Sequence, residues 1–174
     1  IPQAVTSIGQ EAFSSCYSLT SIEIPENITN IEDYTFLLCS GLTEMTIPKN
    51  VTRIGVQAFS SCDGLTNITI PDNVERIEMQ AFSSCSSLNE ITFIGTAPVI
   101  VDFAFEFVTA TCYYPANDPS WANVINKDYG GELTWIPVGE ENDQWTLTAD
   151  MLYVAVGETV RLEALGNDGE PVQG

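Results

Sequence analysis

The stretch Leu65-Thr66-Asn67-Ile68-Thr69-Ile70-Pro71 is one of four closely similar segments in this chain. The other three begin at Leu19, Leu42 and Leu88, so the sequence repeats every 23 residues. Leucine and isoleucine alternate with polar residues in each segment, which is the pattern of a β-strand with one buried face and one exposed face. One such strand cannot bury its apolar face alone, whereas stacked copies can. The repeat therefore predicts a solenoid built around a parallel β-sheet.

A second apolar block follows each strand segment and keeps the same period. Its columns are Ile8, Ile31, Ile54, Ile77 and Ile100, and Phe13, Phe36, Phe59, Phe82 and Phe105. Within one repeat the apolar positions of Ile8 to Cys16 fall at i, i+4, i+5 and i+8. This spacing predicts a short helix or 3₁₀ turn packed beneath the sheet. We accordingly expect an α/β solenoid.

The residues of this block also carry a family resemblance. Ile54-Gly55-Val56-Gln57-Ala58-Phe59 and Cys62-Asp63-Gly64-Leu65 resemble the BspA-type leucine-rich repeat, over about residues 1 to 114. The resemblance implies a leucine-rich-repeat fold, an extracellular location at a bacterial cell surface, and attachment to extracellular matrix or to other bacteria. Two repeats carry Glu32 and Glu78 where the pattern prefers glycine. That position is therefore not expected to be a strict left-handed turn.

The regular repeat ends after Phe93, and the chain divides there into further parts. We predict the solenoid over 1–111, an aromatic C-terminal cap over 112–138 and a polar linker over 139–144. Residues 145–174 alternate like short strands and resemble the start of a bacterial immunoglobulin-like domain of group 2. The sequence opens without Met and inside a repeat, so we expect it to be part of a longer protein.

Composition narrows the classes of partner. The chain has 5 Lys and Arg against 24 Asp and Glu, a formal net charge of −19. This charge repels phosphate backbones and anionic lipid surfaces, so nucleic acid and membrane surfaces are poor partners. No apolar run approaches the ~20 residues of a membrane-spanning helix, so no membrane insertion is expected in this piece.

Four cysteines form a column of their own: Cys16, Cys39, Cys62 and Cys85. Stacked coils hold equivalent residues ~4.8 Å apart with parallel Cβ vectors, which does not suit a disulfide. Four thiols spread over three coil steps also cannot surround one tetrahedral zinc ion. We predict a ladder of buried thiols, with Cys112 similarly buried.

Other motifs give little support for catalysis. Histidine is absent, which removes Ser-His-Asp and Cys-His mechanisms, and no phosphate-binding glycine motif is present, so no cofactor is implied. The triplets that begin at Asn27, Asn50 and Asn67 match glycan-acceptor motifs, but Asn27 and Asn50 are interpreted as turn residues after proline.

The exposed face of the predicted sheet is the candidate binding surface. Its two polar columns are Ser21, Glu44, Asn67 and Glu90, and Glu23, Thr46, Thr69 and Thr92. We predict a monomeric, non-catalytic module that binds an extracellular protein through these residues. Alternatives are a glycan-binding component of a polysaccharide-scavenging surface protein, contacting sugar near Tyr113, Tyr114 and Trp121, and a structural spacer. A hydrolase using Glu44 and Glu90, ~9.6 Å apart across two coils, is disfavoured because an open sheet leaves both carboxylates solvated.

Overall fold

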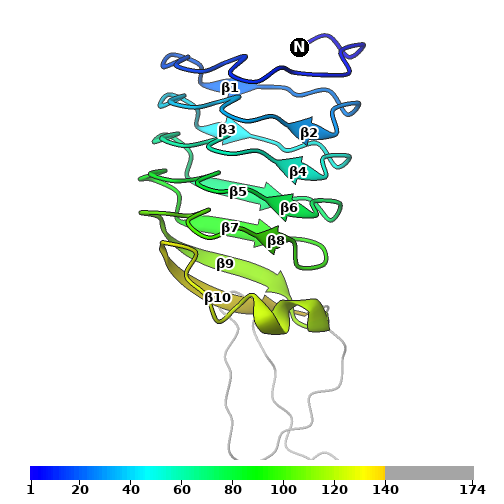
Figure 1. Cartoon of the computed structure of the whole chain (residues 1–174), viewed down its shortest axis with the longest axis vertical. Helices are drawn as coiled ribbons and strands as arrows, with labels where there is room; N and C mark the ends of the chain where they lie inside the picture. The colour runs from blue at the N-terminus through cyan, green and yellow to red at the C-terminus, as the bar shows by residue number, and fades with distance from the viewer. Residues whose placement is uncertain (140–174) are drawn as a thin grey trace, which may run out of the picture. The chain divides into compact units, whose positions relative to one another are not determined.

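The protein folds as a right-angled stack of 23-residue coils, seen in a computed structural model that describes residues 1–139 (Figure 1). One side of the stack is formed by β1 (Ser21–Ile22), β3 (Glu44–Met45), β5 (Asn67–Ile70), β7 (Glu90–Phe93), β9 (Thr109–Pro115) and β10 (Glu132–Val138). All of their pairings are parallel: β1 pairs with β3, and β5, β7, β9 and β10 pair in that order. The predicted leucine-rich-repeat solenoid with a parallel sheet is confirmed.

A second parallel sheet, which the sequence reasoning did not anticipate, runs beside the first. It consists of β2 (Asn30–Ile31), β4 (Arg53–Ile54), β6 (Arg76–Ile77) and β8 (Val99–Ile100). Each strand is only two residues long, and its isoleucine points into the core while the preceding residue points outward. Two residues are too short a segment for alternation to be read from sequence.

The segment after each short strand is a run of turns and not an α-helix. Within one coil, Leu37 donates its N–H to the carbonyl of Tyr34, and Cys39 donates to Phe36, both i to i−3 bonds of the 3₁₀ type. Of the two predicted forms, the structure therefore has the 3₁₀ turn. The one helix among the described residues is the 3₁₀ helix η1 (Pro119–Asn123).

Left-handed residues explain why no helix propagates. Two columns have positive φ without being glycine: Glu11, Tyr34, Gln57, Gln80 and Phe103, and Ser15, Leu38, Ser61, Ser84 and Phe107. A left-handed residue costs about 1–2 kcal/mol and interrupts a right-handed helix. Here it turns alternate N–H groups toward the next coil, where Tyr34 donates to Val56 at 2.8 Å and Leu38 to Ser60 at 2.9 Å. The glycine position of the repeat pattern has no such φ, as the replacements Glu32 and Glu78 predicted.

The core lies between the two sheets and the turns. Five phenylalanines, from Phe13 to Phe105, stack ring on ring with centroids 5.2–5.4 Å apart and interplanar angles of 4–9°. Phe36, Phe59, Phe82 and Phe105 are fully buried, whereas Phe13 in the first coil is half-buried. Identical residues in register thus give each coil the same contact with its neighbours.

The cysteine column is a thiol ladder, as predicted. Cys39, Cys62 and Cys85 are buried and unbridged, and each thiol donates to the carbonyl of a phenylalanine in the preceding coil, at 3.0–3.2 Å. Cys16, in the first coil, is exposed. Burial raises the pKa of the Cys62 thiol above its ordinary value and that of Cys85 to about 12. These thiols therefore stay protonated and act as small core side chains with one donor.

Asparagine forms a matching ladder on the turn after each proline. The amides of Asn27, Asn50 and Asn73 donate to backbone carbonyls of the preceding coil, at 2.7–2.9 Å. The interpretation of Asn27 and Asn50 as turn residues is confirmed, and the amide supplies one reason for the choice of Asn there.

The last coil departs from the repeat. β10 pairs residue for residue with β9, from Glu132 beside Thr109 to Val138 beside Pro115. Trp121 of η1 is buried, with its ring 4.9 Å from that of Phe93, and its indole N–H donates to the carbonyl of Gly95 at 3.2 Å. The division at residues 111 and 112 stays a prediction, although β9 runs across it. The predicted immunoglobulin-like segment 145–174 and all of the linker except Gly139 lie outside the described residues.

Candidate functional site

The strand registers place all eight predicted binding residues on one surface. Ser21 lies beside Glu44, Asn67 beside Glu90, and Thr69 beside Thr92 in neighbouring parallel strands. Seven of the eight side chains are exposed and Thr92 is half-buried. We refer to the outward residues of β1, β3, β5, β7, β9 and β10 as the sheet face. Their role in binding stays a prediction, to which we return below.

The sheet face is longer than the sequence reasoning indicated. Glu90 pairs with Thr111, a step of 21 residues instead of 23 (111 − 90 = 21), so two residues are missing from this coil. The 23-residue alignment had placed Thr111 in the leucine column, which is wrong. Thr111 and Thr134 extend the first polar column, and Tyr113 and Ile136 extend the second. The alternation of half-buried Tyr113 with buried Cys112 was the available signal for this register.

The same shift relocates the fifth cysteine. Cys112 lies beside Ile91 in the sheet and is buried, so it belongs to the strand core and not to the thiol ladder. Its predicted burial is confirmed, and burial raises the pKa of its thiol to about 12.

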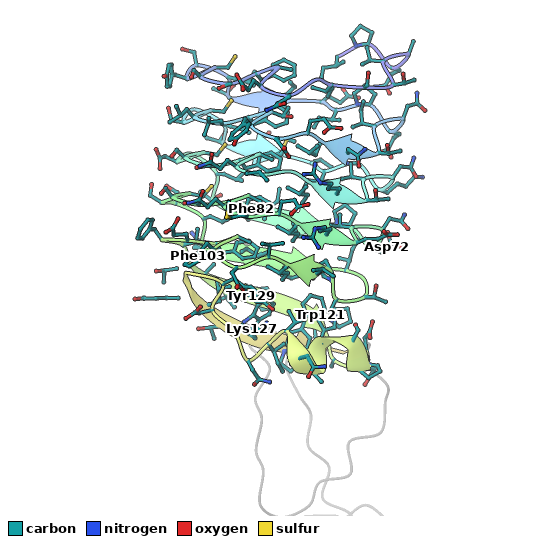
Figure 2. The ribbon with its side chains drawn as sticks, in the orientation of Figure 1. Asp72, Phe82, Phe103, Trp121, Lys127 and Tyr129 are labelled. Carbon is teal, nitrogen blue, oxygen red and sulfur yellow. The ribbon has the colours of Figure 1, made fainter. Side chains whose placement is uncertain are left out.

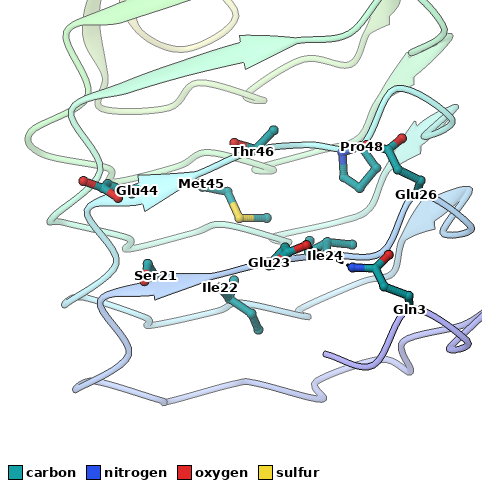
Figure 3. A pocket seen from close by; sticks show the side chains of 10 residues that line it. All are labelled: Gln3, Ser21, Ile22, Glu23, Ile24, Glu26, Glu44, Met45, Thr46 and Pro48. Carbon is teal, nitrogen blue, oxygen red and sulfur yellow. Dashed lines mark hydrogen bonds between the residues drawn. The ribbon is translucent and has the colours of Figure 1, made fainter.

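Two grooves open at opposite ends of the sheet face. The first, of about 390 Å³, is lined by Gln3, Glu23, Glu26 and Glu44 together with Met45 and Pro48 (Figure 3). In it the Gln3 amide donates to the Glu23 carboxylate at 2.9 Å. The second, of about 600 Å³, lies at the β7–β9–β10 end and is lined mainly by Ile94, Tyr113, Tyr114, Pro115 and Val138, with Asn117 and Asp118. One end of the sheet face is thus acidic, and the other is aromatic and apolar.

The ion pairs of the described residues are concentrated on the second sheet. Arg53 contacts Asp33 at 2.8 Å, Glu78 at 3.1 Å and Glu32 at 3.8 Å, and Arg76 contacts Glu78 at 2.9 Å. Burial alone raises the pKa of Glu78, but hydrogen bonds from Arg76 and Arg53 outweigh it and hold that pKa below its ordinary value. The two arginines are therefore neutralised away from the sheet face.

The outward columns of the sheet face contain no base. Their charged members are Glu23, Glu44 and Glu90, and none of these carboxylates forms an ion pair within residues 1–139. Glu44 and Glu90 are both exposed to water. An acid and base pair for glycoside hydrolysis needs one carboxyl in an apolar enclosure, which an exposed position on an open sheet does not supply.

The aromatic region near the last coil differs from the predicted sugar contact in one residue. Trp121 is 1% exposed and packs among Phe93, Tyr114 and Trp135, so it cannot stack on a ligand (Figure 2). Its indole served as a core residue because η1 folds back under the sheet. Tyr113 and Tyr114, both half-buried, remain at the surface.

Metal and membrane features were also sought in residues 1–139. No group of three or more Cys, Asp or Glu side chains in this range is arranged to hold a metal ion. None of the helical structure found there is long and apolar enough to cross a bilayer.

Coils of 23 residues, parallel strands and a polar sheet face above a ladder of identical core residues define a leucine-rich-repeat solenoid. The profile of the BspA type Leucine rich repeat region matches residues 1–112 in six copies. The chain belongs to this family, whose repeats typically serve as non-catalytic binding modules.

Solved structures give the same result. A leucine-rich repeat protein from Bacteroides ovatus is similar, with 31% identity, a TM-score of 0.55 and coverage of 68% of this chain and 31% of the other. A leucine rich cell surface protein from Faecalibacterium prausnitzii is 38% identical, with a TM-score of 0.52 and coverage of 55% and 25%. The chain thus spans about a third or less of each of these proteins. No curated protein matches it.

Proposed function

We propose that this chain is a non-catalytic adhesion or binding module, displayed at a bacterial cell surface, that binds another protein through its sheet face. The observation that carries the proposal is the sheet face itself. It is an exposed polar surface of Glu, Thr, Ser and Asn, set on a rigid frame whose core side chains repeat in register. Surface-exposed variable residues on a rigid scaffold are a common arrangement for recognition.

The similarity to a cell surface protein of Faecalibacterium prausnitzii supports the proposed location. The location predicts that an antibody against this chain labels intact, unpermeabilised cells that express its gene. Labelling that appears only after permeabilisation would contradict it.

The alternative of glycan binding is weaker, because burial of Trp121 removes the largest of its three proposed contact rings. A glycan array decides between the two ligand classes. Saturable binding of a neutral oligosaccharide that is lost in Tyr113→Ala would favour glycan recognition over the protein-binding proposal.

A steric substitution tests the proposed binding surface. Thr69 is exposed at the centre of the sheet face, and Val99, 57% exposed on the second sheet, provides a matched control position. The full chain is used to select binders from a phage-displayed random peptide library, and the selected clones are measured again on Thr69→Trp and Val99→Trp. We expect Thr69→Trp to weaken binding about tenfold or more, since a bulky ring covers the central contact, and Val99→Trp to leave it within about twofold.

Two results would overturn the proposal. One is a set of clones that tolerate Thr69→Trp but lose binding in Val99→Trp. The other is a selection that yields no clone binding the chain above an uncoated surface. Both variants are surface changes, and an unchanged urea midpoint verifies that each is folded.

A further inference from the structure

One column of the sheet face has chemically different ends. From β1 to β9 it consists of Glu23, Thr46, Thr69, Thr92 and Tyr113, one residue from each coil. Glu23 lies in the acidic groove and Tyr113 in the aromatic groove. Three threonine hydroxyls, each able to donate and accept a hydrogen bond, lie between them.

Charge gives the acidic end a preferred partner. Glu23 and Glu44 carry negative charge on a face without any base, while Arg53 and Arg76 are occupied by Asp33, Glu32 and Glu78 on the second sheet. The only side-chain hydrogen bond that Glu23 receives comes from the neutral amide of Gln3. A cationic side chain from outside would therefore find uncompensated carboxylates there, beside the apolar surface of Met45 and Pro48 on which its stem can lie.

The aromatic end suits an apolar side chain. Ile94 is 56% exposed and Ile136 is 39% exposed, and both lie near Tyr113 at this end of the face. Clustered exposed apolar side chains at the end of a polar face mark a contact site more often than isolated ones do.

The coil spacing fixes the separation of the two ends. Neighbouring strands lie about 4.8 Å apart, so β3 and β9 are about 14 Å apart, and β1 and β9 about 19 Å. An extended polypeptide advances about 3.3 Å per residue. A bound segment that runs along the solenoid axis thus covers this distance in about four to six residues.

We propose that the sheet face binds an extended segment of a partner protein in which a basic side chain and an apolar or aromatic side chain are separated by about five residues. The basic side chain occupies the groove of Glu23 and Glu44, and the apolar side chain occupies the groove at Tyr113. The segment crosses β5 and β7, where Thr69 and Thr92 bind its backbone. This inference rests on the proposed function and adds the chemistry and spacing of the partner.

Synthetic peptides test both features on the full chain. The probes are fluorescein-labelled peptides with two adjacent arginines and one tryptophan, separated by Gly-Ser spacers of about one, five or ten residues, and are measured by fluorescence anisotropy. We expect the spacer of about five residues to bind most tightly, because only that length reaches both grooves at low strain. Raising the salt concentration should weaken its binding.

Charge variants provide the second readout. The double variant Glu23→Gln, Glu44→Gln should weaken binding about five- to twentyfold, since each exposed carboxylate contributes about two- to fivefold, and Tyr113→Ser should weaken it to a similar extent. Glu75→Gln removes the same charge from an exposed position beside the second sheet and should change binding less than about twofold. Glutamine at position 23 retains an acceptor for Gln3.

The outcomes separate the two proposals. Equal binding of all three spacers, equal binding of a peptide with glutamates in place of the arginines, or full binding by the double Glu variant would overturn the inference. If library-selected clones still lose binding in Thr69→Trp, protein binding by the sheet face survives and only the charge and spacing are wrong. If Thr69→Trp also has no effect, both proposals fail.

Discussion

The stack of phenylalanine rings predicts a position-dependent loss of stability on truncation to alanine. Phe59 is fully buried, and its ring lies 5.3 Å from Phe36 on one side and 5.2 Å from Phe82 on the other. Truncation of a core phenylalanine costs about 3–5 kcal/mol, and two flanking rings with no solvent contact place Phe59→Ala at the upper end, about 4–5 kcal/mol. Few surrounding side chains can move to fill the gap, because both neighbours are held in the same stack.

Phe13 provides a matched control within the same column. It is half-buried and has one ring neighbour, Phe36 at 5.4 Å, so Phe13→Ala should cost about 1–2 kcal/mol. Urea unfolding followed by far-UV circular dichroism measures both free energies. With a slope of about 1–3 kcal/mol per molar urea, the midpoints should differ by at least about 1 M. Equal losses for the two variants, or a loss below about 1 kcal/mol for Phe59→Ala, would refute the stack as a cooperative core.

Three further predictions follow from the ladders and ion pairs. In the native chain at pH 8, Ellman's reagent should react promptly with one thiol, Cys16, and with all five only after unfolding, because burial raises the pKa of Cys85 and Cys112 to about 12; prompt reaction of more than one thiol would contradict this. Glu78→Gln should lower the free energy of unfolding by about 1–2 kcal/mol at pH 7. The folded-state pKa of Glu78 is lowered, so its contribution is present above the ordinary carboxyl pKa of about 4.3 and is lost as pH falls through the folded value; a gap between wild type and variant that persists at pH 2 would argue against the ion pair. Asn50→Ala, which removes the 2.7 Å bond to the carbonyl of Glu26, should cost about 1 kcal/mol in the same urea assay, and no loss would mean that water replaces the amide.

Sequence periodicity predicted the frame of this protein well, because each column has a single physical cause. Isoleucine in the strand, phenylalanine in the turn and cysteine beside it must all fill the same space in every coil. The period alone therefore placed Cys39, Cys62 and Cys85 in the core and put Ser21, Glu44, Asn67 and Glu90 on one face. Site residues on such a face can be found by alternation once the strand is known.

Backbone features that leave no compositional signal were missed. The second sheet consists of two-residue strands, and its isoleucines fit a helical period equally well. The left-handed positions carry Glu, Tyr, Gln, Ser, Leu and Phe, and none is the glycine that would have identified them. The hydrogen bonds to the next coil that stabilise these conformations are made by main-chain atoms, which sequence patterns do not report.

The aromatic end of the sheet face was missed for a different reason. A two-residue deletion between β7 and β9 shifts the register, and an alignment on a constant period then assigns Thr111 and Tyr113 to the wrong columns. Only pairing with β7 shows that Tyr113 continues the column of Thr92. Deviations from a repeat are where local packing overrides the period, and here Trp121 and Trp135 provide that packing.

The inter-coil hydrogen bonds on the turn side all point the same way, from N–H groups of one coil to carbonyls of the next. Each coil consequently presents the same donors to one neighbour and the same acceptors to the other. A whole coil is therefore an interchangeable unit, and duplication or loss of 23 residues within the stack would preserve every contact on either side of it. Such an event would change the length of the sheet face by one strand spacing, about 4.8 Å. Gene duplication could in this way adjust the reach of a receptor surface in fixed increments, each equivalent to one or two residues of a bound polypeptide, without redesign of its core.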